Sequence, residues 1–264
     1  MRNSKTNELV LTGLFTAIII IMAFTPLGYI PLVVINATII HIPVILGSLF
    51  CGPKKGAFLG FVFGFTSCLK ATIVGGTLSS FVFSPVLAAS LVGTSGIFKS
   101  LFIAFVPRIL VGVIPYFVYI GIKNLWGTVL NVLMSVFLAF GVYAFLGKMS
   151  ESLSQAAALG IGIAVGAVVF IVVEAVFIRK STQVIPFVYA GVAGAMTNTL
   201  LVMGSIFVLY KDAYADAIGV AGNAVLGVIT GVISFNGVIE AIVAAIIVYL
   251  VGLVLNTIKP IAAK

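Results

Sequence analysis

Long stretches without charge alternate with short polar turns along the chain, and this pattern predicts membrane-spanning helices. No charged residue occurs from Leu9 to Pro53, which leaves room for two spans of about 20 residues each. The segment Thr25–Pro31 divides this stretch, because its prolines and its glycine interrupt a helix. We therefore expect helices near residues 8–24 and 37–51.

The same reasoning divides the remainder of the chain, for a total of about eight spans. The charged turn Gly52–Gly56 separates the second helix from a third at about 56–72. Residues 73–100 are rich in glycine and serine, which predicts an external loop with a short or re-entrant helix. The fourth helix is expected to begin at Pro107 or slightly earlier and to end near 121. The remaining spans are expected at 127–147, 156–178, 184–209 and 233–256.

Composition supports this interpretation. Charged residues make up 8% of the 264 residues, whereas soluble globular proteins carry about 25%. Apolar residues make up 62%, and the mean hydropathy is +1.34. These values exclude a soluble enzyme, a disordered chain and a disulfide-stapled secreted domain, so the expected fold class is an all-α polytopic membrane protein.

The basic residues behind the net charge of +8 indicate how the chain is oriented in the membrane. The basic residues are scattered singly or in pairs, whereas a nucleic-acid surface needs them gathered on one face. With a cytoplasmic N-terminus, nine of the 14 Lys and Arg residues fall inside, and five fall outside or in the outer leaflet. We therefore expect a multi-pass membrane protein with both termini in the cytoplasm. The nine inside residues are Arg2, Lys5, Lys54, Lys55, Lys123, Arg179, Lys180, Lys259 and Lys264.

Small residues recur at helical spacing and predict close contacts between helices, because lipid provides no hydrophobic force to bring helices together. The third predicted helix carries a doubled GxxxG motif, for which internal packing is the favoured explanation. The motifs are Gly56, Gly60 and Gly64, then Gly162 with Gly166, and Gly227 with Gly231.

Several polar side chains fall inside the predicted spans, where a charge costs about 3 kcal/mol, so each is a candidate for function. Asn236 and Glu240 are four residues apart, which places them on one face of the last helix. We expect side chains from three helices to surround one outward-facing pocket. These are Arg108, Asn198, Asn236 and Glu240.

Each polar residue also has a structural explanation. Arg108 can extend to the outer headgroups, Glu240 can form an ion pair with Arg108, and Asn198 can make an interhelical hydrogen bond. Glu174 precedes the pair Arg179–Lys180, which favours an interfacial ion pair.

Enzyme chemistry is not visible in the sequence. The chain has no Walker A motif, so we expect no ATPase within it. Its single histidine excludes a His-rich metal site and argues against a serine–histidine intramembrane protease. Cys51 and Cys68 lie in apolar runs without CxxC spacing and suit packing. We expect a protein that is not an enzyme and has no metal or cofactor.

Six segments together carry a resemblance to one family. They are Thr25–Leu32, Ala37–Gly47, Gly52–Gly64, Val106–Gly112, Ala195–Leu200 and Asn236–Ala245. The chain resembles the substrate-binding S components of energy-coupling-factor (ECF) vitamin transporters, and within that family it is most similar to the pantothenate type. The resemblance covers roughly residues 8–122 and 183–256.

The resemblance implies a six-helix core that binds one vitamin at its outer side. Such proteins join a module of two ATPases and a transmembrane coupling protein, and they topple in the membrane to deliver the substrate inward. Small residues on the first helix meet the coupling protein in this family. The matching positions here are Gly13 and Ala17.

Residues 124–181 depart from the family pattern, because they hold two spans that the six-helix core lacks. An inserted pair of spans restores the original sidedness, so the flanking helices keep their orientation. We therefore expect a single integral membrane domain over residues 1–264, with a transmembrane hairpin inserted at 124–181.

The resemblance and the residue types converge on an anionic substrate. Pantothenate has a carboxylate, an amide and two hydroxyls, and Arg108 is suited to pair with the carboxylate. The loop Gly28–Asn36 is expected to close over the site and exclude water. The substrate-binding residues expected are Arg108, Asn198, Asn236, Glu240, His41 and Asn36, although His41 beside Pro43 suits packing equally well.

Other functions remain open at this point. Glu240 and the asparagines also suit a polar aromatic vitamin such as pyridoxine or hydroxymethylpyrimidine. A stand-alone secondary transporter would need a coupling-ion site, for which Glu174 and Glu240 are the available carboxylates. A membrane-embedded enzyme is disfavoured because no catalytic constellation is present.

Overall fold

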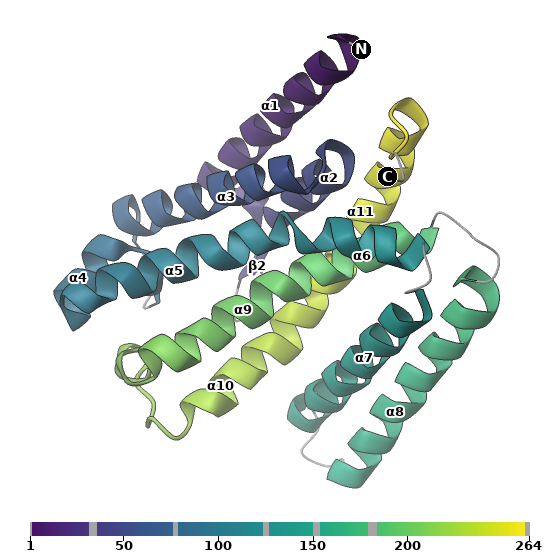
Figure 1. Ribbon diagram of the computed structural model, residues 1–264. Coiled ribbons are helices and arrows are strands. Elements are labelled where there is room, and N and C mark those ends of the chain that lie inside the picture. The colour runs from purple at the N-terminus through teal and green to yellow at the C-terminus, as the bar shows by residue number, and fades with distance from the viewer. Residues whose placement is uncertain are drawn as a thin grey trace.

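The computed structural model describes residues 2–31, 36–75, 79–123, 127–149, 154–178 and 184–261, which form a helical bundle (Figure 1). Within these ranges, seven helices are long and apolar enough to cross a membrane, and α2 is a shorter apolar helix. The structure thus confirms an all-α polytopic membrane protein. The elements are α1 (Arg2–Phe24), η1 (Pro26–Gly28), β1 (Tyr29–Pro31), β2 (Asn36–Thr38), α2 (His41–Cys51), α3 (Pro53–Ile73), η2 (Ser80–Val82), α4 (Pro85–Val92), α5 (Thr94–Val111), α6 (Ile114–Lys123), α7 (Gly127–Met149), α8 (Gln155–Val172), the π-helix η3 (Val173–Ile178), α9 (Val184–Ile218), α10 (Val225–Val232), the π-helix η4 (Ile233–Gly237) and α11 (Val238–Ile258).

The break between the first two helices is longer than predicted. The expected helix at 37–51 begins only at His41, and Asn36–Thr38 instead forms β2, which pairs antiparallel with β1. Tyr29 lies opposite Thr38 in this register. The pairing satisfies backbone groups that would otherwise be unpaired between two apolar helices, which explains why an extended hairpin replaces helix here.

The doubled GxxxG motif of α3 packs directly on the backbone of α5. A Cβ atom added at Gly56, Gly60 or Gly64 would overlap a carbonyl oxygen of α5 or of the residue that follows it. This close approach confirms the predicted packing role and sets the separation of the two helices. The facing pairs are Gly56 with Gly112, Gly60 with Arg108, and Gly64 with Ala104.

The predicted start of the fourth span at Pro107 is wrong. Helix α5 begins at Thr94 and contains Pro107 in its interior, and Thr94–Ile122 forms one long apolar stretch that bends where α5 meets α6. A proline inside a helix leaves the carbonyl four residues earlier without its N–H partner. Another donor must satisfy that carbonyl if the helix is to continue.

The final span begins at Val225 rather than at 233, so this predicted span is too short. The predicted span 184–209 agrees with the structure, because α9 (Val184–Ile218) has a kink at Tyr210, whose dihedral angles are not helical. The exposed charged residues Lys211 and Asp212 lie in the shorter helical part after this kink. The helix stops before Gly219, whose φ of +70° lies in the left-handed region that favours glycine.

Helices α7 and α8 lie against each other at one side of the bundle (Figure 1). Gly162 and Gly166 of α8 meet the backbone of Ala139 and Ser135 on α7, which confirms the packing role of this second glycine motif. Gly227 has no atom within 4 Å of an added Cβ, so the third motif makes no close contact there. That this hairpin is an insertion into a single domain stays a prediction.

Replacing Gly60 by alanine is expected to destabilise the protein, because the new Cβ would overlap the Arg108 carbonyl oxygen. Overpacking of this kind costs about 1–3 kcal/mol, which thermal unfolding in detergent will register as a lower Tm. The matched control is Gly227→Ala, where an added Cβ meets nothing and the Tm should be unchanged or slightly raised. Equal losses in both variants would contradict the packing role.

Candidate functional site

Arg108 lies in the last turn of α5, and its side chain is only 6% exposed. Its Nη1 donates a hydrogen bond of 2.7 Å to the carbonyl oxygen of Ile103. That carbonyl is four residues before Pro107 and therefore lacks its helical partner. The arginine thus replaces the hydrogen bond that the proline removes. A snorkelling arginine at the headgroups would be exposed, so this geometry argues against that explanation.

Two aromatic rings accompany the guanidinium. The Cζ atom of Arg108 lies 4.7 Å from the ring centroid of Phe83 and 5.4 Å from that of Phe63. A cation over an aromatic face is stabilised by the ring quadrupole, and more strongly where water is excluded. The charge at Arg108 is therefore retained inside the bundle by a backbone carbonyl and aromatic faces.

Glu240 is also buried, at 6% exposure, and joins three elements. Its Oε1 accepts a hydrogen bond of 2.8 Å from the backbone N–H of Thr38, and its Oε2 accepts one of 2.8 Å from the hydroxyl of Thr199. The positive charge of Arg108 acts on this carboxylate electrostatically. Glu240 therefore ties the β1–β2 hairpin to α9 and α11.

Asn198 and Asn236 present buried acceptors next to this network. They are 7% and 4% exposed, and the Oδ1 atom of each has no hydrogen-bond partner among the described residues. A buried unsatisfied polar group costs about 1–3 kcal/mol, so native proteins seldom retain one without a reason. Asn236 lies in the π-helix η4, a feature that is frequent at functional sites. These two oxygens are suited to accept hydrogen bonds from a ligand.

His41 and Asn36 are the remaining predicted site residues. His41 is completely buried at the start of α2, and its ring nitrogens have no partner at hydrogen-bonding geometry in the described ranges, although the Thr38 backbone lies close by. Asn36 begins β2, but its side chain lies outside the described part of the structure, as do residues 32–35 of the predicted closing loop. The contacts of Thr38 place this hairpin beside the polar network.

The structure brings most of the predicted residues to one region of the bundle. Helices α5 and α11 both pack against α9, and β2 contacts α11 and η4. Sequence reasoning missed Thr38, Thr199, Phe63 and Phe83. Thr199 follows Asn198 directly and could have been found from that polar run. The two phenylalanines carry no signal that distinguishes them from the rest of the 21 phenylalanines in the chain.

Glu174 occupies a separate polar cluster between the α7–α8 pair and the rest of the bundle. Its Oε1 accepts a hydrogen bond of 2.9 Å from Thr128, and its Oε2 accepts one of 3.3 Å from Asn131. Asn131 in turn accepts a hydrogen bond from the hydroxyl of Tyr189 on α9. The predicted partners Arg179–Lys180 lie outside the described residues. The observed contacts fasten α7 and η3 to α9.

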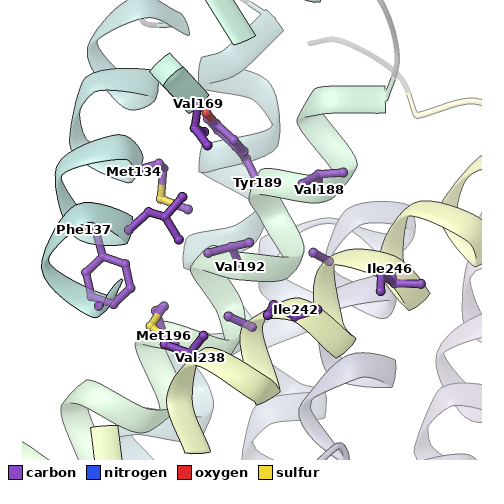
Figure 2. Close-up of a pocket in the computed structure, with 14 residues that line it drawn as sticks. Met134, Phe137, Val169, Val188, Tyr189, Val192, Met196, Val238, Ile242 and Ile246 are labelled. Atoms are coloured by element: carbon purple, nitrogen blue, oxygen red, sulfur yellow. The ribbon is translucent and has the colours of Figure 1, made fainter. Parts of the chain in front are cut away.

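An apolar cavity of about 260 Å³ lies between α7, α8, α9 and α11 (Figure 2). Its lining residues are apolar apart from Tyr189, whose hydroxyl already bonds to Asn131. A polar anion in this cavity would lose its hydrogen bonds to water without replacement. The cavity is therefore distinct from the polar site around Arg108.

Helix α1 presents a second surface of interest. Gly13 and Ala17 are exposed, and an added Cβ at Gly13 meets nothing within 4 Å. With Val10, Leu14 and Ile21 they form one exposed stripe along the helix. We call these five residues the α1 stripe.

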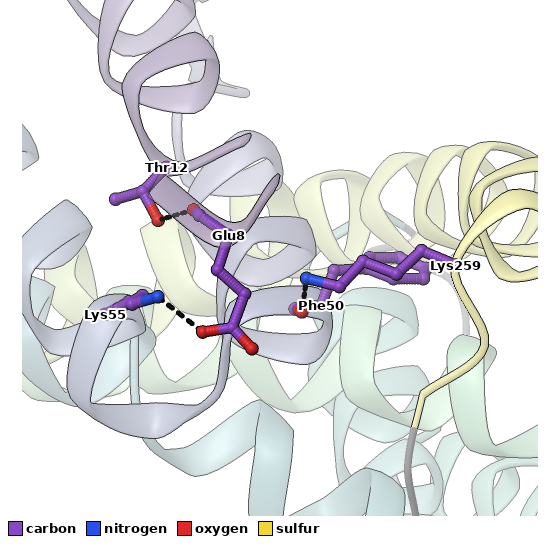
Figure 3. Close-up of polar contacts among 5 residues, drawn as sticks. All are labelled: Glu8, Thr12, Phe50, Lys55 and Lys259. Carbon is purple, nitrogen blue, oxygen red and sulfur yellow. Dashed lines mark hydrogen bonds and ion pairs between the residues drawn. The ribbon is translucent and has the colours of Figure 1, made fainter. Parts of the chain in front are cut away.

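Polar contacts brace the end of the bundle where α1 begins and α11 ends (Figure 3). Lys55 forms an ion pair of 2.6 Å with Glu8, and Lys259 donates a hydrogen bond of 2.9 Å to the Phe50 carbonyl oxygen. Beside them, a groove of about 450 Å³ runs between α1 and α11, lined by Val10, Leu14 and residues of both helices.

The geometry is that of a polytopic membrane protein with a buried polar site, and comparison with known proteins gives its family. The sequence matches the family described as "ECF transporter, substrate-specific component" over residues 7–178. The chain belongs to this family of membrane transport components, as the resemblance predicted.

Two curated relatives are similar to this chain. The pantothenic acid transporter PanT of Lactococcus lactis subsp. cremoris is 42% identical over 161 residues, which cover 53% of this chain and 78% of that protein. The pantothenate transporter PanT of Leuconostoc mesenteroides is 28% identical over 270 residues, which cover 100% of this chain and 98% of that protein.

Replacing Glu240 by alanine is expected to loosen the β1–β2 hairpin, because the Thr38 N–H loses its acceptor. A hydrogen bond to a charged group is worth about 1.5–3 kcal/mol, so hydrogen exchange of a peptide containing Thr38 should accelerate by about 10- to 100-fold. Glu240→Gln retains an acceptor oxygen, so its rate of exchange at Thr38 should lie between those of the alanine variant and the wild type. An unchanged exchange rate at Thr38 in the alanine variant would contradict the role of the Thr38–Glu240 hydrogen bond in holding the hairpin.

Proposed function

We propose that the protein is the pantothenate-binding subunit of an ECF-type ABC importer. The observation that carries the proposal is the arrangement of a buried cationic Arg108 with two buried amide oxygens, of Asn198 and Asn236, that have no partner among the described residues. The names of both relatives, pantothenic acid transporter and pantothenate transporter, support the same vitamin.

The residue chemistry suits pantothenate group by group. The guanidinium has five N–H donors, so Arg108 can bond the Ile103 carbonyl and the vitamin carboxylate together. The amide oxygens of Asn198 and Asn236 accept hydrogen bonds from the amide N–H and the hydroxyls of the vitamin. Charge-assisted hydrogen bonds of the arginine supply the largest share of the affinity.

The β1–β2 hairpin closes the site in this proposal. Glu240 fixes its second strand through Thr38, His41 lies next to this strand in the chain, and Asn36 is proposed as a further substrate-binding residue. Closure excludes water and strengthens the polar contacts to the bound vitamin. Because Glu240 also bonds Thr199 beside Asn198, the position of the hairpin and the position of a ligand-binding residue are coupled.

Delivery of the vitamin requires a partner module. The α1 stripe, with small residues at Gly13 and Ala17, fits close contact with a transmembrane coupling protein, which two ATPases drive. The subunit topples on this module to release the vitamin inward. In this arrangement both termini face the cytoplasm, and the protein resides in the bacterial cell membrane.

The α7–α8 pair is an inserted hairpin of the single membrane domain in this proposal. The Glu174 cluster joins it to α9, so the hairpin moves together with the core when the subunit topples. It lies on the side of α9 and α11 that faces the apolar cavity, and thus leaves the α1 stripe accessible.

Replacing Arg108 by alanine is expected to abolish pantothenate binding, because the vitamin carboxylate would be buried without its counter-charge. The affinity loss, measured by titration calorimetry in detergent, should be about 30-fold or more. Arg108→Lys retains a point charge but not the planar fork and should bind with intermediate affinity. Unchanged affinity in a folded Arg108→Ala protein would overturn the carboxylate assignment.

The identity of the vitamin is tested separately by mass spectrometry of whatever co-purifies with protein made without added vitamin. Bound pantothenate supports the proposal. A bound pyridine or pyrimidine would show that the substrate is another vitamin and not pantothenate. Ion-driven uptake by the purified chain in liposomes, with no vitamin bound, would overturn the importer-subunit proposal in favour of stand-alone transport.

Replacing Ala17 by leucine is expected to weaken assembly with the coupling protein and ATPases, because a larger side chain prevents close approach of α1. Co-purification of the module should fall several-fold, while the affinity for pantothenate stays unchanged. Ala156→Leu, at an exposed position on α8, is the matched control and should assemble normally. Normal assembly of the Ala17 variant would contradict the α1 interface.

A further inference from the structure

Phe83 reaches Arg108 from a short segment that crosses between α3 and α5. The segment includes η2 and ends where α4 begins. The ring centroid of Phe83 lies 4.7 Å from the Arg108 Cζ, which is closer than the 5.4 Å to Phe63. Phe63 belongs to the main hydrophobic core of the bundle, whereas Phe83 is partly buried beside a second cluster.

The segment that carries Phe83 is fixed on both sides. Ser84 caps α4 by accepting a hydrogen bond of 3.2 Å from the Leu87 N–H, and its hydroxyl bonds to that of Thr72 on α3 at 2.8 Å. On the other side, Phe81 meets Tyr210 of α9 edge to face, with ring centroids 5.3 Å apart. Phe83 is therefore held at Arg108 by contacts with two helices.

As a partner for an arginine, an aromatic face differs in its chemistry from a carboxylate. It stabilises the cation without accepting its N–H donors strongly and without cancelling its charge. Glu240, the nearby acid, directs its oxygens to Thr38 and Thr199. Glu240 and Arg108 still interact electrostatically, and the aromatic faces stabilise the cation without adding a negative charge to the site.

We infer that Phe83 positions the Arg108 guanidinium and thereby gives the site its preference for an anionic ligand over a neutral one. The inference rests on the proposed function, because it takes Arg108 as the group that binds the carboxylate. Phe83 acts through the arginine and is a positioning residue. We expect Phe83 to affect the part of the binding affinity that comes from the carboxylate, and not the part that comes from the rest of the ligand.

The experiment compares two ligands that differ only at the carboxylate: pantothenate and pantothenol, its neutral alcohol. Titration calorimetry in detergent gives the affinity of each for the wild type and for Phe83→Leu, which keeps an apolar side chain but removes the ring. A cation–π contact away from water is worth enough to weaken pantothenate binding by about 3- to 30-fold. Pantothenol affinity should change less than about twofold.

Two further variants separate positioning from folding. Phe83→Tyr restores an aromatic face and should return the pantothenate affinity to within about twofold of the wild type. Phe61→Leu is the matched control, because Phe61 is 46% exposed and its ring stacks on Phe65 and Phe105. It should bind both ligands as the wild type does.

Each other outcome overturns the inference. Equal weakening of both ligands in Phe83→Leu would mean a merely structural role, and unchanged pantothenate affinity would mean no role. Failure of Phe83→Tyr to restore binding would exclude the aromatic face as the cause. A wild type that binds no pantothenate, or binds pantothenol as tightly, would instead overturn the proposed function, and the inference with it.

Discussion

A guanidinium buried within a membrane-spanning helix is the constraint on which the centre of this protein depends. Such a charge is tolerated only where the surrounding groups replace water. Pro107 supplies one of them, because it leaves the Ile103 carbonyl for the arginine to bond. Phe63 and Phe83 supply aromatic faces. The glycine contact between α3 and α5 occurs at the level of Arg108 itself, so the packing of these helices and the position of the charge are set together.

Glu240 and Glu174 follow a common pattern of hydrogen bonding. Glu240 accepts hydrogen bonds from Thr38 and Thr199, and Glu174 accepts them from Thr128 and Asn131. In each case hydroxyl and amide donors satisfy the carboxylate, and the bonds join elements distant in sequence. Glu240 joins the β1–β2 hairpin to α9 and α11, whereas the Glu174 cluster joins the α7–α8 pair to α9. These two acids, one buried and one half-buried, thus each connect elements that are distant in sequence.

Buried hydrogen-bond acceptors without a partner among the described residues distinguish the candidate site from the satisfied carboxylates of Glu240 and Glu174. The Asn198 and Asn236 oxygens are buried without partners among the described residues, and they lie beside the network of Glu240. The apolar cavity behind α9 and α11 has no such groups among its lining residues. The polar site and the apolar cavity therefore differ in chemistry, and only the polar site is suited to hold a polar anion.

The sequence by itself determined the class of protein, the approximate number of spans and the polar positions within them, because hydropathy and charge are local properties of the chain. It also predicted the packing of Gly56, Gly60 and Gly64. It could not determine the start of α5, since the sequence does not show that Arg108 bonds the carbonyl that Pro107 frees and so helps the helix to continue. Nor could the sequence predict that Thr38 bonds to Glu240, or that Phe83 contacts Arg108. Those contacts join residues brought together by helix packing, and only the tertiary structure decides which side chains then meet.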